Sequence, residues 1–188
     1  MDSKAYLFLA EGFEEIEGLT VVDLLRRAGM NIITVSIEKE LFVTGAHQII
    51  TKADMLFEDT DYQDAQLLVL PGGMPGTNNL LKHQGLDQLL REFNKAGKWI
   101  AAICAAPKIL GQKGILEGKK AICYPGVEQE LKGAIIVGND VVEDGNIITS
   151  RAMGTAIDFS LHIIKRLKGE AQAQKIADAI CYKHYNNE

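Results

Sequence analysis

Short apolar runs alternate with longer amphipathic stretches along most of the chain. Four of the runs predict buried strands, because they are short, apolar and bounded by turn residues. They cover residues 5–10, 31–37, 67–70 and 99–103. Unbroken apolarity of this kind is typical of strands that are covered by helices on both faces. Three further strands are expected at residues 121–123, 135–137 and 147–149.

The stretches between the strands show the spacing of amphipathic helices. From Ile16, apolar residues recur at Leu19, Val22 and Leu25, and two arginines before Gly29 are typical of a helix C-terminus. Further helices are predicted over residues 86–95, 105–110, 155–167 and 170–185, and a small hairpin over residues 41–51. This alternation predicts a single α/β domain over residues 1–188, built on a mostly parallel sheet.

Composition narrows the class of protein. The 188 residues are 47% hydrophobic and 24% charged, which is average for a globular domain and excludes disordered and fibrous proteins. The net charge of -5 and the scattered basic residues disfavour nucleic-acid binding. No apolar run approaches the ~20 residues of a membrane span, and the N-terminus lacks the pattern of a secretory signal. We therefore expect a cytoplasmic protein without nucleic-acid or membrane partners.

The three cysteines are Cys104, Cys123 and Cys181, and their spacing does not match a metal site. Free thiols in a reducing compartment are the expected state, and no metal is predicted. Ligands of parallel sheets bind at the carboxyl ends of the strands. The turns at residues 11–17, 71–76 and 104–107 are therefore the candidate functional segments.

Cys104 has the most distinctive local context. Residues 101–107 read AAICAAP, so a buried strand is expected to turn into a helix directly at the cysteine. The small residues Ala102 and Ala106 permit a tight, strained turn like a nucleophile elbow. A sulfur at a helix N-terminus favours the thiolate. The alternative is that Cys104 is a small buried apolar residue. Cys123 and Cys181 are expected to be structural, although Cys123 could approach the same strand-end region.

Four separated motifs resemble the ThiJ/PfpI superfamily, in its branch of the parkinsonism-associated protein deglycase and its bacterial relatives. They are residues 12–17 (GFEEIE), 70–73 (LPGG), 101–107 (AAICAAP) and 149–159 (TSRAMGTAIDF). The resemblance covers roughly residues 4–168. It implies a flavodoxin-like three-layer α/β sandwich of the class I glutamine amidotransferase type, usually a homodimer. It implies no cofactor.

The resemblance maps the nucleophile to Cys104 and its acidic partner to Glu17; without it, Glu17 is an ordinary first-turn acid. Two negative charges in a confined space are costly, so we expect a protonated Glu17 that donates to a Cys104 thiolate. This would raise the pKa of Glu17 and lower that of Cys104. Glu14 and Glu15 are expected to face solvent or a dimer partner.

The glycines of the LPGG motif suggest an anion pocket. The N–H groups of Gly72, Gly73 and Ala105 are predicted to bind a sulfinate or a developing oxyanion near the sulfur. The alternative is that Pro71-Gly72-Gly73 only forms a tight turn between a strand and a helix.

Some positions depart from the family pattern. Ala105 stands where the hydrolytic branch has a histidine, which argues against a peptidase. Tyr124 stands where the deglycase branch often has a histidine, and tyrosine is a poor base near neutral pH because its reference pKa is ~10. Residues 152–153 replace a glycine-proline pair. Tyr124 and Arg151 are candidates for the border of the site, and a structural ion pair is the alternative role of Arg151.

Two functional hypotheses follow. The first is a cofactor-free enzyme, like a glyoxalase or protein deglycase, in which Cys104 attacks an α-oxoaldehyde or its adduct and Glu17 moves the proton. The second is a redox-responsive or chaperone-like stress protein, in which an oxidant converts Cys104 to a sulfinate. A flavin carrier is a weaker third hypothesis, because the first turn carries acids where a flavin phosphate would need Ser or Thr.

Overall fold

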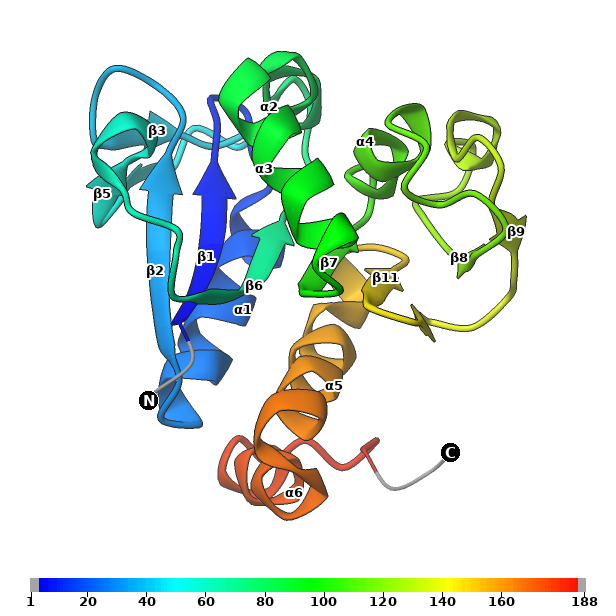
Figure 1. Cartoon of the computed structure of the whole chain (residues 1–188). Coiled ribbons are helices and arrows are strands. Elements are labelled where there is room, and N and C mark those ends of the chain that lie inside the picture. The colour runs from blue at the N-terminus through cyan, green and yellow to red at the C-terminus, as the bar shows by residue number, and fades with distance from the viewer. Residues whose placement is uncertain (1–3, 186–188) are drawn as a thin grey trace.

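The computed structural model describes residues 4–185 and contains a central seven-stranded sheet (Figure 1). The strand order is β10-β11-β7-β6-β1-β2-β5. The strands are β1 (Lys4–Leu9), β2 (Asn31–Ser36), β5 (Met55–Leu56), β6 (Ala65–Leu70), β7 (Trp99–Ile103), β10 (Val141–Asp144) and β11 (Ile147–Ser150). Neighbouring strands of this sheet run parallel, except that β10 pairs antiparallel with β11.

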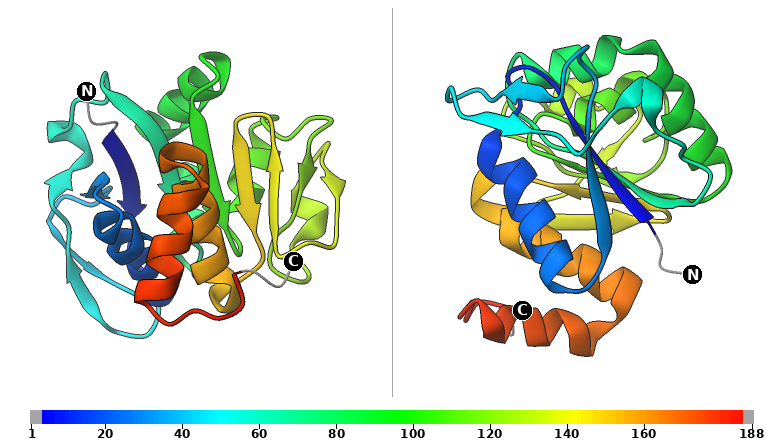
Figure 2. Two further views of the ribbon diagram at one scale, coloured as in Figure 1. Left: turned by 90° about the horizontal axis from the view of Figure 1, so that it is seen from below. Right: turned by 90° about the vertical axis from the view of Figure 1, so that its left-hand side faces the viewer.

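Helices cover both faces of the sheet, as Figure 2 shows. One face carries α1 (Glu15–Arg27) and α5 (Ala156–Lys168), and α6 (Glu170–Ala179) packs on α5. The other face carries α2 (Gly76–Lys82), α3 (Gln84–Lys95) and α4 (Pro107–Gln112). The predicted α/β class with a mostly parallel sheet is confirmed.

The central strand β1 shows why this architecture is stable. Leu7 and Leu9 point into the core below α1 and α5, whereas Tyr6 and Phe8 point into the core below α2 and α3. All four side chains are buried. Burial of each such apolar side chain contributes about 1.5–3 kcal/mol, so a strand that is apolar on both sides belongs in the middle of the sheet.

Several predicted elements have other bounds or places. The segments predicted as strands near residues 121 and 135 form β8 (Lys120–Ala121) and β9 (Ile135–Ile136), which pair with each other outside the central sheet. Ile135 and Ile136 of this small sheet are both exposed. The last helix ends at Ala179, and Cys181 lies beyond it in an exposed turn.

The predicted hairpin is present as β3 (Phe42–Thr44) and β4 (Ile50–Lys52), which pair antiparallel. Its tip is bonded to the turn after β1, since the N–H of Gly12 donates to the carbonyl of Thr44 and the N–H of Ala46 donates to that of Phe13. Among residues 4–185, no helix combines the length and apolarity needed to cross a membrane.

Candidate active site

Three turns meet at the carboxyl edge of the sheet. Leu7 of β1 lies opposite Val69 of β6, and Val69 lies opposite Ala101 of β7. Because these strands are parallel and these residues are in register, the turns that follow the strands lie side by side. The predicted convergence of the three motifs at one edge is therefore confirmed.

Cys104 occupies a strained turn directly after β7. Its φ of 64° lies in the left-handed region, which costs a residue with a side chain on the order of 1–3 kcal/mol. Its N–H donates to the carbonyl of Ser150 at 2.9 Å, and its carbonyl accepts from the N–H of Tyr124 at 2.7 Å. These bonds hold the unusual backbone. The helix does not begin at the cysteine as predicted, because residues 104–106 form a turn and α4 begins at Pro107.

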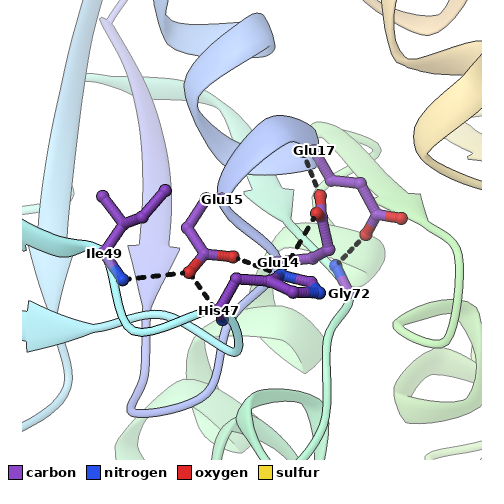
Figure 3. A network of polar contacts seen from close by, with 6 residues as sticks. All are labelled: Glu14, Glu15, Glu17, His47, Ile49 and Gly72. Carbon is purple, nitrogen blue, oxygen red and sulfur yellow. Dashed lines mark hydrogen bonds and ion pairs between the residues drawn. The ribbon is translucent and has the colours of Figure 1, made fainter.

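Glu17 enters the site from the first turn of α1 and is only 1% exposed. Its own N–H is capped by Oε2 of Glu14 at 2.7 Å, and its Oε2 accepts from the N–H of Gly72 at 3.0 Å (Figure 3). The carboxyl group also accepts from the N–H of Met153 and shares a hydrogen bond with the Cys104 side chain. The two groups that the family resemblance pairs are therefore in contact.

Backbone N–H groups face the sulfur from two sides. Those of Ala105 and Gly73 hydrogen-bond to it, as expected for an anion pocket. The third expected donor, Gly72, instead directs its N–H to Glu17. Gly72 has another requirement, since a Cβ atom there would lie 2.5 Å from Oε2 of Glu17 and 2.7 Å from Cβ of Cys104. Only a glycine fits between the two side chains.

Burial governs the ionisation of the pair. It raises the pKa of Glu17 to about 7, in the expected direction. The expected lowering of the Cys104 pKa is wrong: burial and the negative charge of Glu17 raise it, and the N–H groups of Ala105 and Gly73 offset this only in part. When Glu17 ionises, one proton therefore remains on the pair, and both groups compete for it.

Glu14 and Glu15 are buried within the chain, so the expectation that they face solvent, one of the two alternatives, is wrong. Glu15 is 3% exposed and accepts from the backbone N–H of His47 at 2.7 Å, from its Nδ1 at 2.9 Å and from the N–H of Ile49 at 3.4 Å (Figure 3). Glu14 is buried beside it as the cap of α1. The sequence carries no local sign of this role, because the partners of Glu15 belong to the distant hairpin.

Glu14, Glu15 and His47 place one potential metal-ligand atom each within 4.8 Å of one another. The Glu15 carboxylate is already occupied by the N–H donors of the hairpin, and Glu14 caps Glu17. Hydrogen bonding within the protein accounts for this cluster, and we assign no metal to it.

Tyr124 and Arg151 lie next to the turn at Cys104. The Tyr124 N–H contacts the Cys104 carbonyl, and Arg151 directly follows the strand that pairs with β7. None of the ion pairs within residues 4–185 includes Arg151, so the structural ion pair considered for it is not found there. Burial raises the pKa of Cys123, and the positive charge of Arg151 offsets part of this rise. The guanidinium of Arg151 therefore lies near Cys123.

Comparison with known proteins identifies the family. Residues 3–166 match the DJ-1/PfpI family. The chain belongs to the DJ-1/PfpI family. Protein dj-1beta of Drosophila melanogaster is 34% identical to it over 182 residues, which cover 96% of this chain and 97% of that protein. Protein DJ-1 homolog A of Arabidopsis thaliana is 37% identical over 172 residues; the match covers 91% of this chain but only 44% of that relative.

Solved structures of this family have the same fold. Oxidised DJ-1 of Toxoplasma gondii superposes with a TM-score of 0.93 at 33% identity, covering 96% of this chain and 99% of that one. Drosophila melanogaster DJ-1beta superposes with a TM-score of 0.91 at 33% identity, covering 96% and 98%. The flavodoxin-like DJ-1/PfpI fold expected from the motifs is thus confirmed.

One relative found by sequence is named for an activity. A Pyrococcus abyssi protein named as a deglycase is 29% identical over 167 residues, which cover 88% of this chain and 99% of that relative.

Proposed function

We propose that this protein is a cofactor-free, cysteine-dependent enzyme that converts α-oxoaldehydes, or their adducts on other molecules, into hydroxy acids. The main support for this proposal is the buried contact between Cys104 and Glu17. The carboxyl pKa of Glu17 is about 7, which suits proton transfer at neutral pH. The relative named as a deglycase supports the same class of chemistry.

The first step joins the sulfur to the aldehyde. The Glu17 carboxylate takes the thiol proton as Sγ of Cys104 attacks the aldehyde carbon, and the new C–S bond replaces the π bond of the carbonyl. The carbonyl oxygen then takes the proton back from Glu17, which yields a hemithioacetal. The N–H groups of Ala105 and Gly73 stabilise the negative charge that develops on the sulfur during the transfer.

The second step moves a proton between the two carbons of the substrate. Glu17 removes the proton from the carbon bonded to sulfur, and the electron pair forms an enediolate with the neighbouring carbonyl. Return of the proton to that neighbouring carbon, with transfer of the hydroxyl proton from the oxygen on the sulfur-bearing carbon to the other oxygen, gives a hydroxyacyl thioester. Water then cleaves the C–S bond, releases the hydroxy acid and restores the thiol. The net reaction adds one water to the oxoaldehyde and needs no redox partner.

Turnover of methylglyoxal to lactate tests this proposal. We expect hydroxy-acid formation by the unmodified protein and a loss of more than about 100-fold in Cys104→Ala. Cys123→Ala and Cys181→Ala are matched controls, because Cys123 is buried in the core and Cys181 lies in a surface turn, and both should retain turnover. Equal activity in Cys104→Ala and the unmodified protein would contradict the proposal.

The second candidate is a redox-responsive or chaperone-like role. It is supported by the solved structure of an oxidised DJ-1 and by the N–H groups that surround the sulfur, which would also bind a sulfinate. Peroxide treatment followed by mass spectrometry separates the two candidates. Selective addition of two oxygen atoms to Cys104, in a protein that turns over no oxoaldehyde, would favour the redox role.

We also propose that the protein acts in the cytoplasm as a homodimer on a small carbonyl compound or an oxidant, without nucleic-acid or membrane partners. A face of exposed apolar residues on α1 and the hairpin, Ile16, Leu19 and Ile49, supports self-association. Light scattering after size-exclusion chromatography should show a dimer, and Leu19→Glu should shift it toward monomer. A monomer at every concentration would contradict this part.

A further inference from the structure

Two residues with large, half-exposed apolar side chains are bonded through their backbone to the Cys104–Glu17 pair. Tyr124 is 49% exposed, and its N–H donates to the Cys104 carbonyl at 2.7 Å. Met153 is 48% exposed, and its N–H donates to the Glu17 carboxyl group. Each member of the pair is thus bonded to the backbone of one exposed apolar residue.

The two residues come from separate segments, Tyr124 from the chain after β8 and Met153 from the 3₁₀ turn that precedes α5. Both segments are held by hydrogen bonds: the N–H of Ile122 donates to Oγ1 of Thr149 in a buried bond, and Thr155 forms part-buried bonds with Ser150 and Ala152. These bonds fix the backbone segments that carry the two exposed side chains next to the Cys104–Glu17 pair.

Binding of a ligand over apolar surface that is exposed next to a reactive group is favourable, because it removes this surface from water. A substrate bonded to Sγ of Cys104 has to extend its substituent away from the buried pair, toward the open side of the site. A methyl group covers little of the surface of Tyr124 and Met153, whereas an aromatic ring can contact both the phenol ring and the thioether.

We propose that Tyr124 and Met153 form an apolar subsite that selects α-oxoaldehydes carrying an aromatic or other bulky apolar substituent. This inference rests on the proposed function and names its substrate class. It also gives a role to two positions at which the sequence departs from the usual histidine and proline of similar proteins. The alternative occupant is a substrate with an anionic substituent, because the positively charged Arg151 lies two positions before Met153.

A comparison of three aldehydes tests the subsite. The ratio of kcat/KM for phenylglyoxal to that for methylglyoxal is measured in the unmodified protein, in Tyr124→Ala, in Met153→Ala and in the double variant. We expect a ratio of about ten or more that falls toward one in the double variant. Ile50→Ala, at an exposed apolar residue of the hairpin, is the matched control and should retain the ratio. A ratio near one, or an unchanged ratio in the double variant, overturns the inference, as does a preference for 4-carboxyphenylglyoxal, whose substituent is anionic, over both.

A second measurement does not require turnover. The rates at which N-phenylmaleimide and N-ethylmaleimide alkylate Cys104 are compared after normalisation to their rates with a free thiol. A preference for the phenyl compound that disappears in the double variant supports the subsite. This holds even if the protein turns over no oxoaldehyde, and in that case only the proposed function fails. Turnover of oxoaldehydes without any such preference overturns the subsite and leaves the proposed function standing.

Discussion

The backbone N–H of Gly72 donates to Oε2 of Glu17 at 3.0 Å across 55 positions of sequence. This bond fixes the carboxyl group beside Cys104, and the missing side chain of Gly72 provides the space in which the two groups meet. The LPGG turn thus positions the acid, while its second glycine faces the sulfur.

The pH dependence of Cys104 alkylation reports on the pair. Because the Glu17 pKa is about 7, the rate with iodoacetamide should rise with a midpoint near this pH, as the carboxylate becomes available to take the thiol proton. In Glu17→Gln the buried thiol has no such base, so the rate at pH 7 should fall about tenfold or more and the midpoint should move well above ~8.5, the ordinary thiol value. A profile unchanged in Glu17→Gln would show that the carboxyl group does not control the thiol.

The raised pKa of Glu17 also predicts how stability depends on pH. A carboxyl whose pKa is higher in the folded state contributes stability that is fully present below about 4.5 and is lost as the pH rises through about 7. The loss is on the order of 3 kcal/mol. Glu17→Gln carries no such charge, so it should exceed the unmodified protein in stability at about pH 8 and lose this advantage near pH 4.5. Denaturant unfolding at both pH values measures the difference; a constant difference would contradict the assignment.

Gly72→Ala tests the space between the two side chains. The added methyl group would lie 2.5 Å from Oε2 of Glu17 and 2.7 Å from Cβ of Cys104, so the pair must separate. We expect the alkylation profile to move toward that of Glu17→Gln and the free energy of unfolding to fall by about 1–3 kcal/mol. Gly138→Ala is the matched control, because a Cβ atom there meets nothing within 4 Å. Similar effects of the two substitutions would rule out a specific role for Gly72.

Glu15→Gln tests the bonds between the helix start and the hairpin. The amide has one oxygen where the carboxylate has two, so the N–H donors of His47 and Ile49 and the imidazole lose part of their partner. We expect faster amide hydrogen exchange at residues 46–49 and a loss of about 1–3 kcal/mol in unfolding free energy. His47→Ala removes only the side-chain contact and should have a smaller effect. Unchanged exchange in Glu15→Gln would mean that the hairpin is held by its other bonds alone.

Much of this molecule follows from local pattern. The strands at β1, β2, β6 and β7 are predicted because each is an apolar run of strand length, and their order with the helices predicts a parallel sheet. A parallel sheet in turn places the ends of its strands at one edge, so the convergence of three motifs near Cys104 is also predictable.

The chemistry within that edge depends on contacts between distant segments. Glu17 and Gly72 are 55 positions apart, and Glu15 and His47 are 32 apart. No periodicity shows which N–H group bonds to which carboxylate. For this reason the sequence predicts Gly72 as a donor of the anion pocket and Glu15 as facing solvent or a dimer partner. Desolvation likewise depends on what surrounds a group from every side, and for this reason the raised pKa of Cys104 emerges only in the folded chain.

The sequence by itself determined the layers and the strained turn and, through its resemblance to a family, indicated the pairing of Cys104 with Glu17, because these depend on local periodicity and on motifs. Only the tertiary structure decided how deeply the pair is buried, which backbone donors it shares and which apolar side chains remain open beside it. Those properties arise only when five separate parts of the chain meet at one place.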